Sequence, residues 1–141
     1  MSVECQNLLP DLTVLIRGLR PKEINRITRK IKKAAFIPRR NGQDDDGLSA
    51  SQPANDTREM LMKRLSNADG VFCRFQAVSV RLIEERGIQL DVCPSPTELD
   101  PFHALIKGVP TGREPEQIAI ATRLAEKLAE ISLEYIPPFE N

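Results

Sequence analysis

The spacing of apolar residues predicts two helices at the start of the chain. Residues 7–19 carry apolar side chains at helical intervals, and residues 21–36 repeat the same 3.6-residue period. Pro21 suits the first position of the second helix, because its missing N–H would be unpaired there in any case, and Pro38 ends the helical region. We therefore expect an N-terminal αα unit, joined by a tight turn after Gly18.

The middle of the chain is typical of short strands. In residues 71–75, Val71, Cys73 and Phe75 would face one way and Phe72 and Arg74 the other, and residues 88–92 alternate apolar and polar side chains; both have the two-residue period of a strand. Residues 57–65 have the pattern of a short helix with a capping residue at its start. Residues 78–86 fit either a helix or a strand, and we favour a helix.

The longest amphipathic stretch lies near the C-terminus. Residues 115–135 show an apolar stripe at helical spacing, Pro115 stands at its start and two prolines follow its end. Residues 100–112 form a connector with several prolines and glycines. The whole pattern predicts an α+β fold in a single domain of residues 1–141, with an N-terminal αα unit, a short antiparallel sheet and a long C-terminal helix.

One polar segment interrupts this pattern. Residues 38–57 are rich in Gly, Ser, Asn, Asp and Pro and have no apolar period, so we expect a flexible loop or arm that a partner orders. Asp44, Asp45 and Asp46 are the predicted contacts of that arm. They do not form a calcium loop, since placing Gly47 at the sixth position of an EF-hand puts a glycine first and a proline last.

The charges are strongly segregated, although the chain has 20 basic and 20 acidic residues and no formal net charge. Ten of the basic residues lie between Arg17 and Arg40, where Glu23 is the only acid. This asymmetry favours a polyanionic partner or self-association of basic and acidic surfaces, and a solvated helix face explains it equally well. The predicted contact residues for a partner or polyanion are Arg20, Lys22, Arg26, Arg29, Lys30, Lys32, Lys33, Arg39 and Arg40.

Residues with catalytic patterns are scarce. His103 is the only histidine and has no recognisable Ser or Cys partner motif, so a structural role is favoured. Glu84 and Glu85 are adjacent and would diverge on a helix, which does not suit a general acid and base. The nucleophile-elbow, zinc-protease and phosphate-loop motifs are absent. We predict no catalytic, cofactor-binding or metal-binding residue, no cofactor and no enzyme activity.

The cysteines and the termini bear on the compartment. Cys5, Cys73 and Cys93 are odd in number and never spaced as C-x-x-C, so neither a disulfide framework nor a zinc site is predicted, and a reducing compartment fits best. The N-terminus does not resemble a signal peptide, and no apolar run is long enough to span a membrane.

Four stretches carry a series of motifs over most of the chain. They are LLPDLTVLIRGLRPKEINRITRKIKKA at residues 8–34, NGQDDDG at 41–47, REMLMKRLSNADGVFCRFQAVSVRLIEERG at 58–87 and FHALIKGVPTGREPEQIAIATRLAEKLAE at 102–130. In this order they resemble the phage virion morphogenesis family, the tail-completion proteins of contractile-tailed bacteriophages. The chain departs from that family at EERG, residues 84–87, where a His-Gln-aromatic-Gly sequence is frequent, although the glycine is retained.

The resemblance implies a structural protein of the head-proximal end of the tail, which completes or terminates the tail and joins it to the head. It would act as a homo-oligomeric ring in the virion (tail or neck), after assembly in the host cytoplasm. Its partners would be its own copies and tail tube, sheath or neck proteins, with non-specific DNA contact as a further option and no membrane. The alternative is a small nucleic-acid-binding protein whose basic helix contacts phosphates through Arg26, Arg29, Lys30, Lys32 and Lys33.

Overall fold

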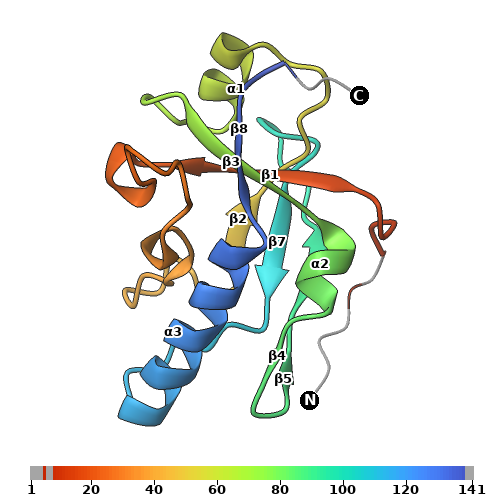
Figure 1. Cartoon of the computed structure of the whole chain (residues 1–141). Helices are drawn as coiled ribbons and strands as arrows, with labels where there is room; N and C mark the ends of the chain where they lie inside the picture. The colour runs from red at the N-terminus through yellow and green to blue at the C-terminus, as the bar shows by residue number, and fades with distance from the viewer. Residues whose placement is uncertain (1–4, 6–7, 139–141) are drawn as a thin grey trace.

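The computed structural model describes Cys5 and residues 8–138. Its strands form two three-stranded antiparallel sheets and a small hairpin, and a long helix runs beside them (Figure 1). The first sheet has the order β1 (Val14–Leu19), β3 (Val71–Gln76), β8 (Leu133–Tyr135). The second has the order β2 (Leu48–Ala50), β7 (Ala104–Lys107), β6 (Asp91–Pro94). The hairpin consists of β4 (Glu84–Glu85) and β5 (Ile88–Gln89). The helices are α1 (Arg58–Arg64), α2 (Ala77–Arg81) and α3 (Pro115–Glu130), with 3-10 turns η1 (Pro21–Glu23) and η2 (Lys33–Phe36).

Helices combined with antiparallel sheets confirm the α+β class. The N-terminal αα unit, however, is wrong in its first half, because residues 14–19 form β1 and pair with all of β3. Leu15 and Leu19 pack in the main core, whereas Ile16 packs in a second cluster. A strand that is buried on both faces has a continuous apolar run, which periodicity alone cannot distinguish from a buried helix.

The second predicted helix is also wrong, since residues 21–36 fold into η1, an exposed loop and η2. Ile24 and Ile31 bridge each other at the base of the loop, and both are buried. The Asn25 side chain accepts hydrogen bonds from two backbone N–H groups in the turn, and such local bonds compete with a helix. Ile27 lies at the tip of the loop and is 92% exposed, although the pattern placed it on the buried stripe.

The later elements lie closer to the predicted ones. The predicted helix of residues 57–65 is α1, with Thr57 as the capping residue, and the predicted strand of residues 71–75 is β3. The predicted strand of residues 88–92 is divided between β5 and β6, and residues 78–86 are divided between α2 and β4. The connector of residues 100–112 contains β7.

Helix α3 begins at Pro115, as the pattern indicates, but it ends at Glu130 rather than near Tyr135. The Ser132 hydroxyl donates to the carbonyl of Leu128 and satisfies one of the last helical acceptors. The chain then turns into β8, which pairs with β3. Among the helices that the structure describes, none is long and apolar enough to cross a membrane.

The segment of residues 38–57 has more structure than the predicted loop or arm. It contains β2, which pairs with β7 in the second sheet. Gly47 precedes this strand at φ +137°, and a Cβ added there would lie 2.7 Å from the carbonyl oxygen of Ile106. Glycine at this position therefore allows β2 to approach β7.

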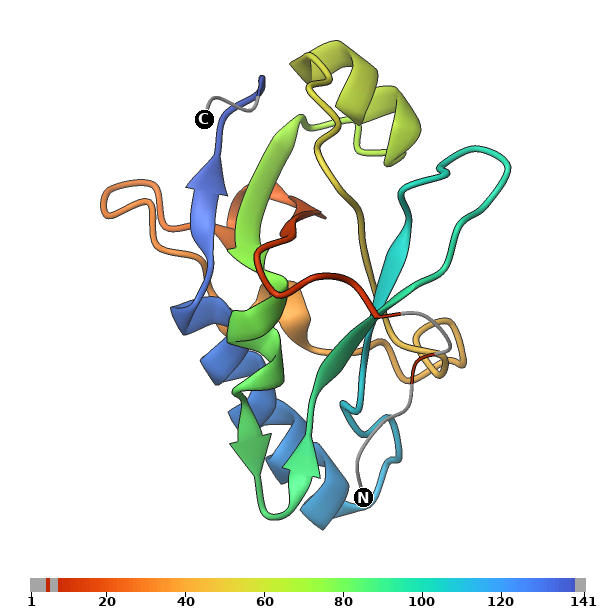
Figure 2. The same ribbon diagram turned by 90° about the vertical axis from the view of Figure 1, so that its right-hand side faces the viewer.

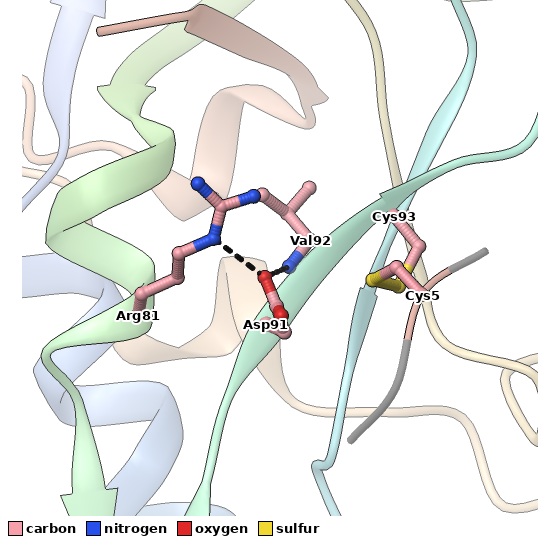
Figure 3. The surroundings of a disulfide bond; sticks show 5 residues. All are labelled: Cys5, Arg81, Asp91, Val92 and Cys93. Atoms are coloured by element: carbon pink, nitrogen blue, oxygen red, sulfur yellow. Dashed lines mark hydrogen bonds and ion pairs between the residues drawn. A yellow bond between two sulfur atoms is a disulfide. The ribbon is translucent and has the colours of Figure 1, made fainter. Parts of the chain in front are cut away.

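A disulfide joins Cys5 to Cys93 on β6, which corrects the prediction that the cysteines form no disulfide (Figure 3). The two Cα atoms are 5.3 Å apart, although the residues are separated by 88 positions in the sequence. Beside the disulfide, Asp91 accepts hydrogen bonds from the side chain of Arg81 and the backbone of Val92, both at 2.7 Å. A pairing over such a separation cannot be predicted from the sequence. Because the reducing compartment was predicted from cysteines without a disulfide, that prediction loses its support.

The third cysteine provides a test of the core. Cys73 lies on β3 with no exposed surface, and burial raises the pKa of its thiol to about 12. The unfolded chain releases this proton above about pH 8.5, whereas the folded chain keeps it. Stability from this group is therefore complete below pH 8.5 and falls as the pH rises. We expect a loss of about 1–2 kcal/mol between pH 7 and pH 10 in urea unfolding. In the Cys73→Ala variant, the free energy of unfolding should fall less over this pH range than in the wild type. An equal fall in both proteins would contradict a buried thiol.

Candidate anion-binding cleft

A cleft of about 940 Å³ lies where the two sheets meet α1. One wall is the end of β1 with η1, part of η2 and the residues that follow it, and the other is the end of α1 with the loop that joins β6 to β7. Ser49 of β2 and His103, just before β7, also line the cleft. The cleft therefore collects side chains from five segments that are distant in the sequence.

Arg17 is the central cation of the cleft. Its Nε donates to the carbonyl of Ala35 at 2.9 Å, and its Nη1 donates to the carbonyl of Ser49 at 2.6 Å. The guanidinium also lies over the ring of Phe36, 5.6 Å from the ring centre. None of the ion pairs formed by the described residues involves Arg17. An arginine carries five N–H donors, so this half-buried cation has donors for an anion from solution.

Burial lowers the pKa of the Arg17 guanidinium, but the group keeps its positive charge. Desolvation lowers the pKa of Arg17 from its usual value. A guanidinium nevertheless stays protonated at neutral pH. The cleft thus holds a positive charge that has lost part of its hydration, which is the condition under which an anion binds strongly.

Ser49 and His103 form a hydrogen-bonded pair in the same cleft. The Nδ1 atom of His103 lies 2.9 Å from the carbonyl oxygen of Ser95, and its Nε2 atom lies 3.3 Å from Oγ of Ser49. A carbonyl oxygen can only accept, so Nδ1 carries the hydrogen, and in the neutral imidazole Nε2 then accepts from the Ser49 hydroxyl. The serine partner that sequence motifs did not provide for His103 is therefore supplied by the fold.

Arg64 holds two walls of the cleft together. Its guanidinium pairs with Asp56 at 2.9 Å and with Asp100 at 2.7 Å. It also donates to Oγ of Ser51 and to the carbonyl of Gln52, both at 2.6 Å. The side chains of Arg64 and Asp100 are only 10% and 6% exposed, so this is a buried network between α1, the segment after β2 and the β6–β7 loop.

The predicted basic face divides into paired and unpaired residues. Arg29 pairs with Glu134, and Lys33 pairs with Glu126 at 3.7 Å, so the 24–33 loop is attached to β8 and α3 (Figure 2). Arg40 donates to the carbonyl of Gly112 at 2.5 Å. Five further residues of the set form no ion pair among the described residues and are exposed: Arg20, Lys22, Arg26, Lys30 and Lys32.

The three aspartates predicted as contacts of the arm differ in burial and pairing. Asp44 is 7% exposed and pairs with Arg39 at 3.2 Å. Burial acts to raise the pKa of Asp44, but the hydrogen bonds and charge of Arg39 outweigh burial and lower it. Asp45 and Asp46 are exposed. Asp44 thus has a partner within its own chain.

Of the predicted contact residues, the structure brings Arg20, Lys22, Arg39 and Asp44 to the cleft. Sequence reasoning missed Arg17, Ser49 and Arg64 as members of a common site. Arg17 was visible as the first residue of the basic stretch, but only its place on β1 shows that it faces the cleft. Within the described residues, no cluster of three or more His, Cys, Asp or Glu side chains could hold a metal ion.

No protein-family model matches the sequence, and neither a curated protein nor a solved structure matches the chain. The structural role in a phage tail therefore stays a prediction. Residues 8–34, the first of the stretches that carry the resemblance, contain β1, η1 and the start of η2 and not the two helices that their apolar spacing predicts.

Proposed function

We propose that the protein binds phosphate esters and that the cleft around Arg17 is the binding site. The observation that carries this proposal is the half-buried guanidinium of Arg17, which donates to two backbone carbonyls and pairs with no carboxylate of the described residues. The planar fork of a guanidinium matches the oxygens of a phosphate, which it binds through two parallel hydrogen bonds.

The mouth of the cleft supports the same ligand class. Arg20 and Lys22 line it and form no ion pair among the described residues. By contrast, the acids Asp44 and Asp100 in the cleft are already paired with arginines of the chain. Glu23 and Asp69 also line the cleft and form no ion pair among the described residues, but five Lys and Arg side chains line it against these four acids. This excess of positive charge favours an anionic ligand.

Free nucleotides and nucleic-acid strands share this phosphate chemistry, and a binding experiment separates them. Anisotropy would be measured with fluorescent single-stranded and duplex oligonucleotides, and calorimetry with a nucleoside 5′-monophosphate. A strand that also contacts Lys30 and Lys32 should lose affinity steeply with added salt, whereas a mononucleotide should show a shallow slope. Absence of binding to all three probes would overturn the proposal.

The Arg17→Gln variant is expected to bind the same probe at least about tenfold more weakly, because it loses a charge-assisted hydrogen-bond pair. Arg123→Gln is the matched control, since Arg123 is an exposed arginine on α3 outside the cleft. Equal affinities of the two variants for the mononucleotide would show that Arg17 is not the phosphate contact.

A further inference from the structure

We propose that Ser49 and His103 are a nucleophile and a general base, and that the cleft hydrolyses the phosphate ester it binds. This inference rests on the proposed function, because the phosphate must reach the cleft before it can react. It differs from that function in requiring a chemical step at Oγ of Ser49.

The tautomer of His103 suits a general base. The carbonyl of Ser95 holds the Nδ1 hydrogen, so the Nε2 lone pair points to the Ser49 hydroxyl at 3.3 Å. A nucleophile, a base and a group that orients the base are the arrangement that activates a serine. Separations of this length in an unliganded site shorten when a substrate binds.

The backbone around Ser49 presents its side chain to the cleft. Leu48 and Ala50 are buried on either side of it in β2, and Ser49 is exposed between them because side chains alternate along a strand. Arg64 binds Ser51, two residues after Ser49, and Asp100, three residues before His103. Arg64 is therefore a positioning residue, because it fixes the segment that carries Ser49 relative to the segment that carries His103.

The charge beside Ser49 favours phosphorus over an acyl carbon as the reacting centre. Arg17 Nη1 donates to the carbonyl of Ser49 at 2.6 Å, which places the guanidinium next to the nucleophile. A guanidinium matches the equatorial oxygens of a transferring phosphoryl group and stabilises the charge that they carry in the transition state.

The reaction has two balanced steps. Oγ of Ser49 attacks phosphorus while its proton passes to Nε2 of His103. The bond from phosphorus to the leaving oxygen breaks, and that oxygen takes the proton from His103 and departs as an alcohol. Water then attacks the phosphoserine while His103 accepts a proton from it, and Ser49 leaves and is reprotonated by His103. The sum is a phosphate ester plus water giving an alcohol plus a phosphate.

The full chain would be incubated with bis(p-nitrophenyl) phosphate, and release of p-nitrophenolate followed by absorbance. We expect release to fall by about a hundredfold or more in Ser49→Ala and in His103→Gln, given the usual contribution of a general base. Ser79→Ala is the matched control, because Ser79 is a serine of α2 outside the residues that line the cleft, and it should release product at the wild-type rate. The first displacement on this diester leaves its second nitrophenyl group in place, so peptide mass spectrometry after acid quenching should find a p-nitrophenyl phosphoryl adduct on Ser49.

The two proposals fail in different ways. Ser49→Ala should retain the mononucleotide affinity of the wild type, whereas Arg17→Gln should lose it. Wild-type binding without p-nitrophenolate release, or release that is equal in Ser49→Ala, would overturn the catalytic inference and leave the binding proposal standing. Each rate would be corrected for the uncatalysed reaction, and a release from p-nitrophenyl acetate that depends on Ser49 while release from the phosphate diester does not would overturn the assignment of phosphorus as the reacting centre.

Discussion

Replacement of Arg64 by methionine is expected to lower the free energy of unfolding by about 3–5 kcal/mol. The cation is held by Asp56 and Asp100, and Asp100 is only 4% exposed as a residue. Removal of the guanidinium would leave the buried carboxylate of Asp100 without its partner. The free-energy cost of removing that charge from water would then no longer be offset by the ion pair. The face of the Phe102 ring, 5.3 Å from the guanidinium, would lose its cation as well.

Urea unfolding followed by circular dichroism measures this loss. Lys63→Met is the matched control, because Lys63 precedes Arg64 on α1 and is exposed. Its replacement should change the free energy of unfolding by no more than about 0.5 kcal/mol. If Arg64→Met were as stable as Lys63→Met, the buried network would not hold the walls of the cleft.

Replacement of Phe36 by alanine is expected to cost about 3–5 kcal/mol of stability. Phe36 is fully buried and packs edge-on against Phe75, with ring centres 6.0 Å apart. The cost is the lost transfer free energy of the ring plus the cavity that is left. Because the guanidinium of Arg17 lies over this ring, the variant should also bind phosphate esters more weakly.

A control variant separates the losses of stability and of affinity in Phe36→Ala from the effect of removing apolar area at the surface. Ile27→Ala is the control, since Ile27 is 92% exposed and its truncation should cost no more than about 0.5 kcal/mol. Binding by Phe36→Ala would be measured at a temperature where the variant is folded. Unchanged stability would contradict the position of Phe36 in the core, and unchanged affinity would contradict its support of Arg17.

The sequence predicted the later part of the fold better than the first third. Thr57 at the start of α1, the alternation over β3 and Pro115 at the start of α3 are local signals, and the structure follows each of them. The first third depends on tertiary context. Strand β1 buries apolar side chains on both faces, Leu15 and Leu19 in one cluster and Ile16 in the other, and no local signal distinguishes that arrangement from a helix.

The cleft was largely hidden from sequence reasoning for the same reason. Ser49 and His103 are 54 residues apart, and they meet because β2 pairs with β7. That pairing was not predicted, since β2 lies inside the segment of residues 38–57, which has the composition of a loop. The excess of basic residues was visible in the sequence, but composition could not show that Arg29 and Lys33 form ion pairs within the chain while Arg17 forms none with the residues that the structure describes.

The single histidine of the chain allows the most direct test of the cleft. Its imidazole carbon-bound protons give assigned NMR signals without a set of variants, and His103 lines the cleft with Arg17. We predict that a nucleoside 5′-monophosphate shifts the His103 signals to saturation in the wild-type protein and does not shift them in Arg17→Gln. Signals that stay in place in the wild type, or that shift equally in Arg17→Gln, would contradict a phosphate site at Arg17.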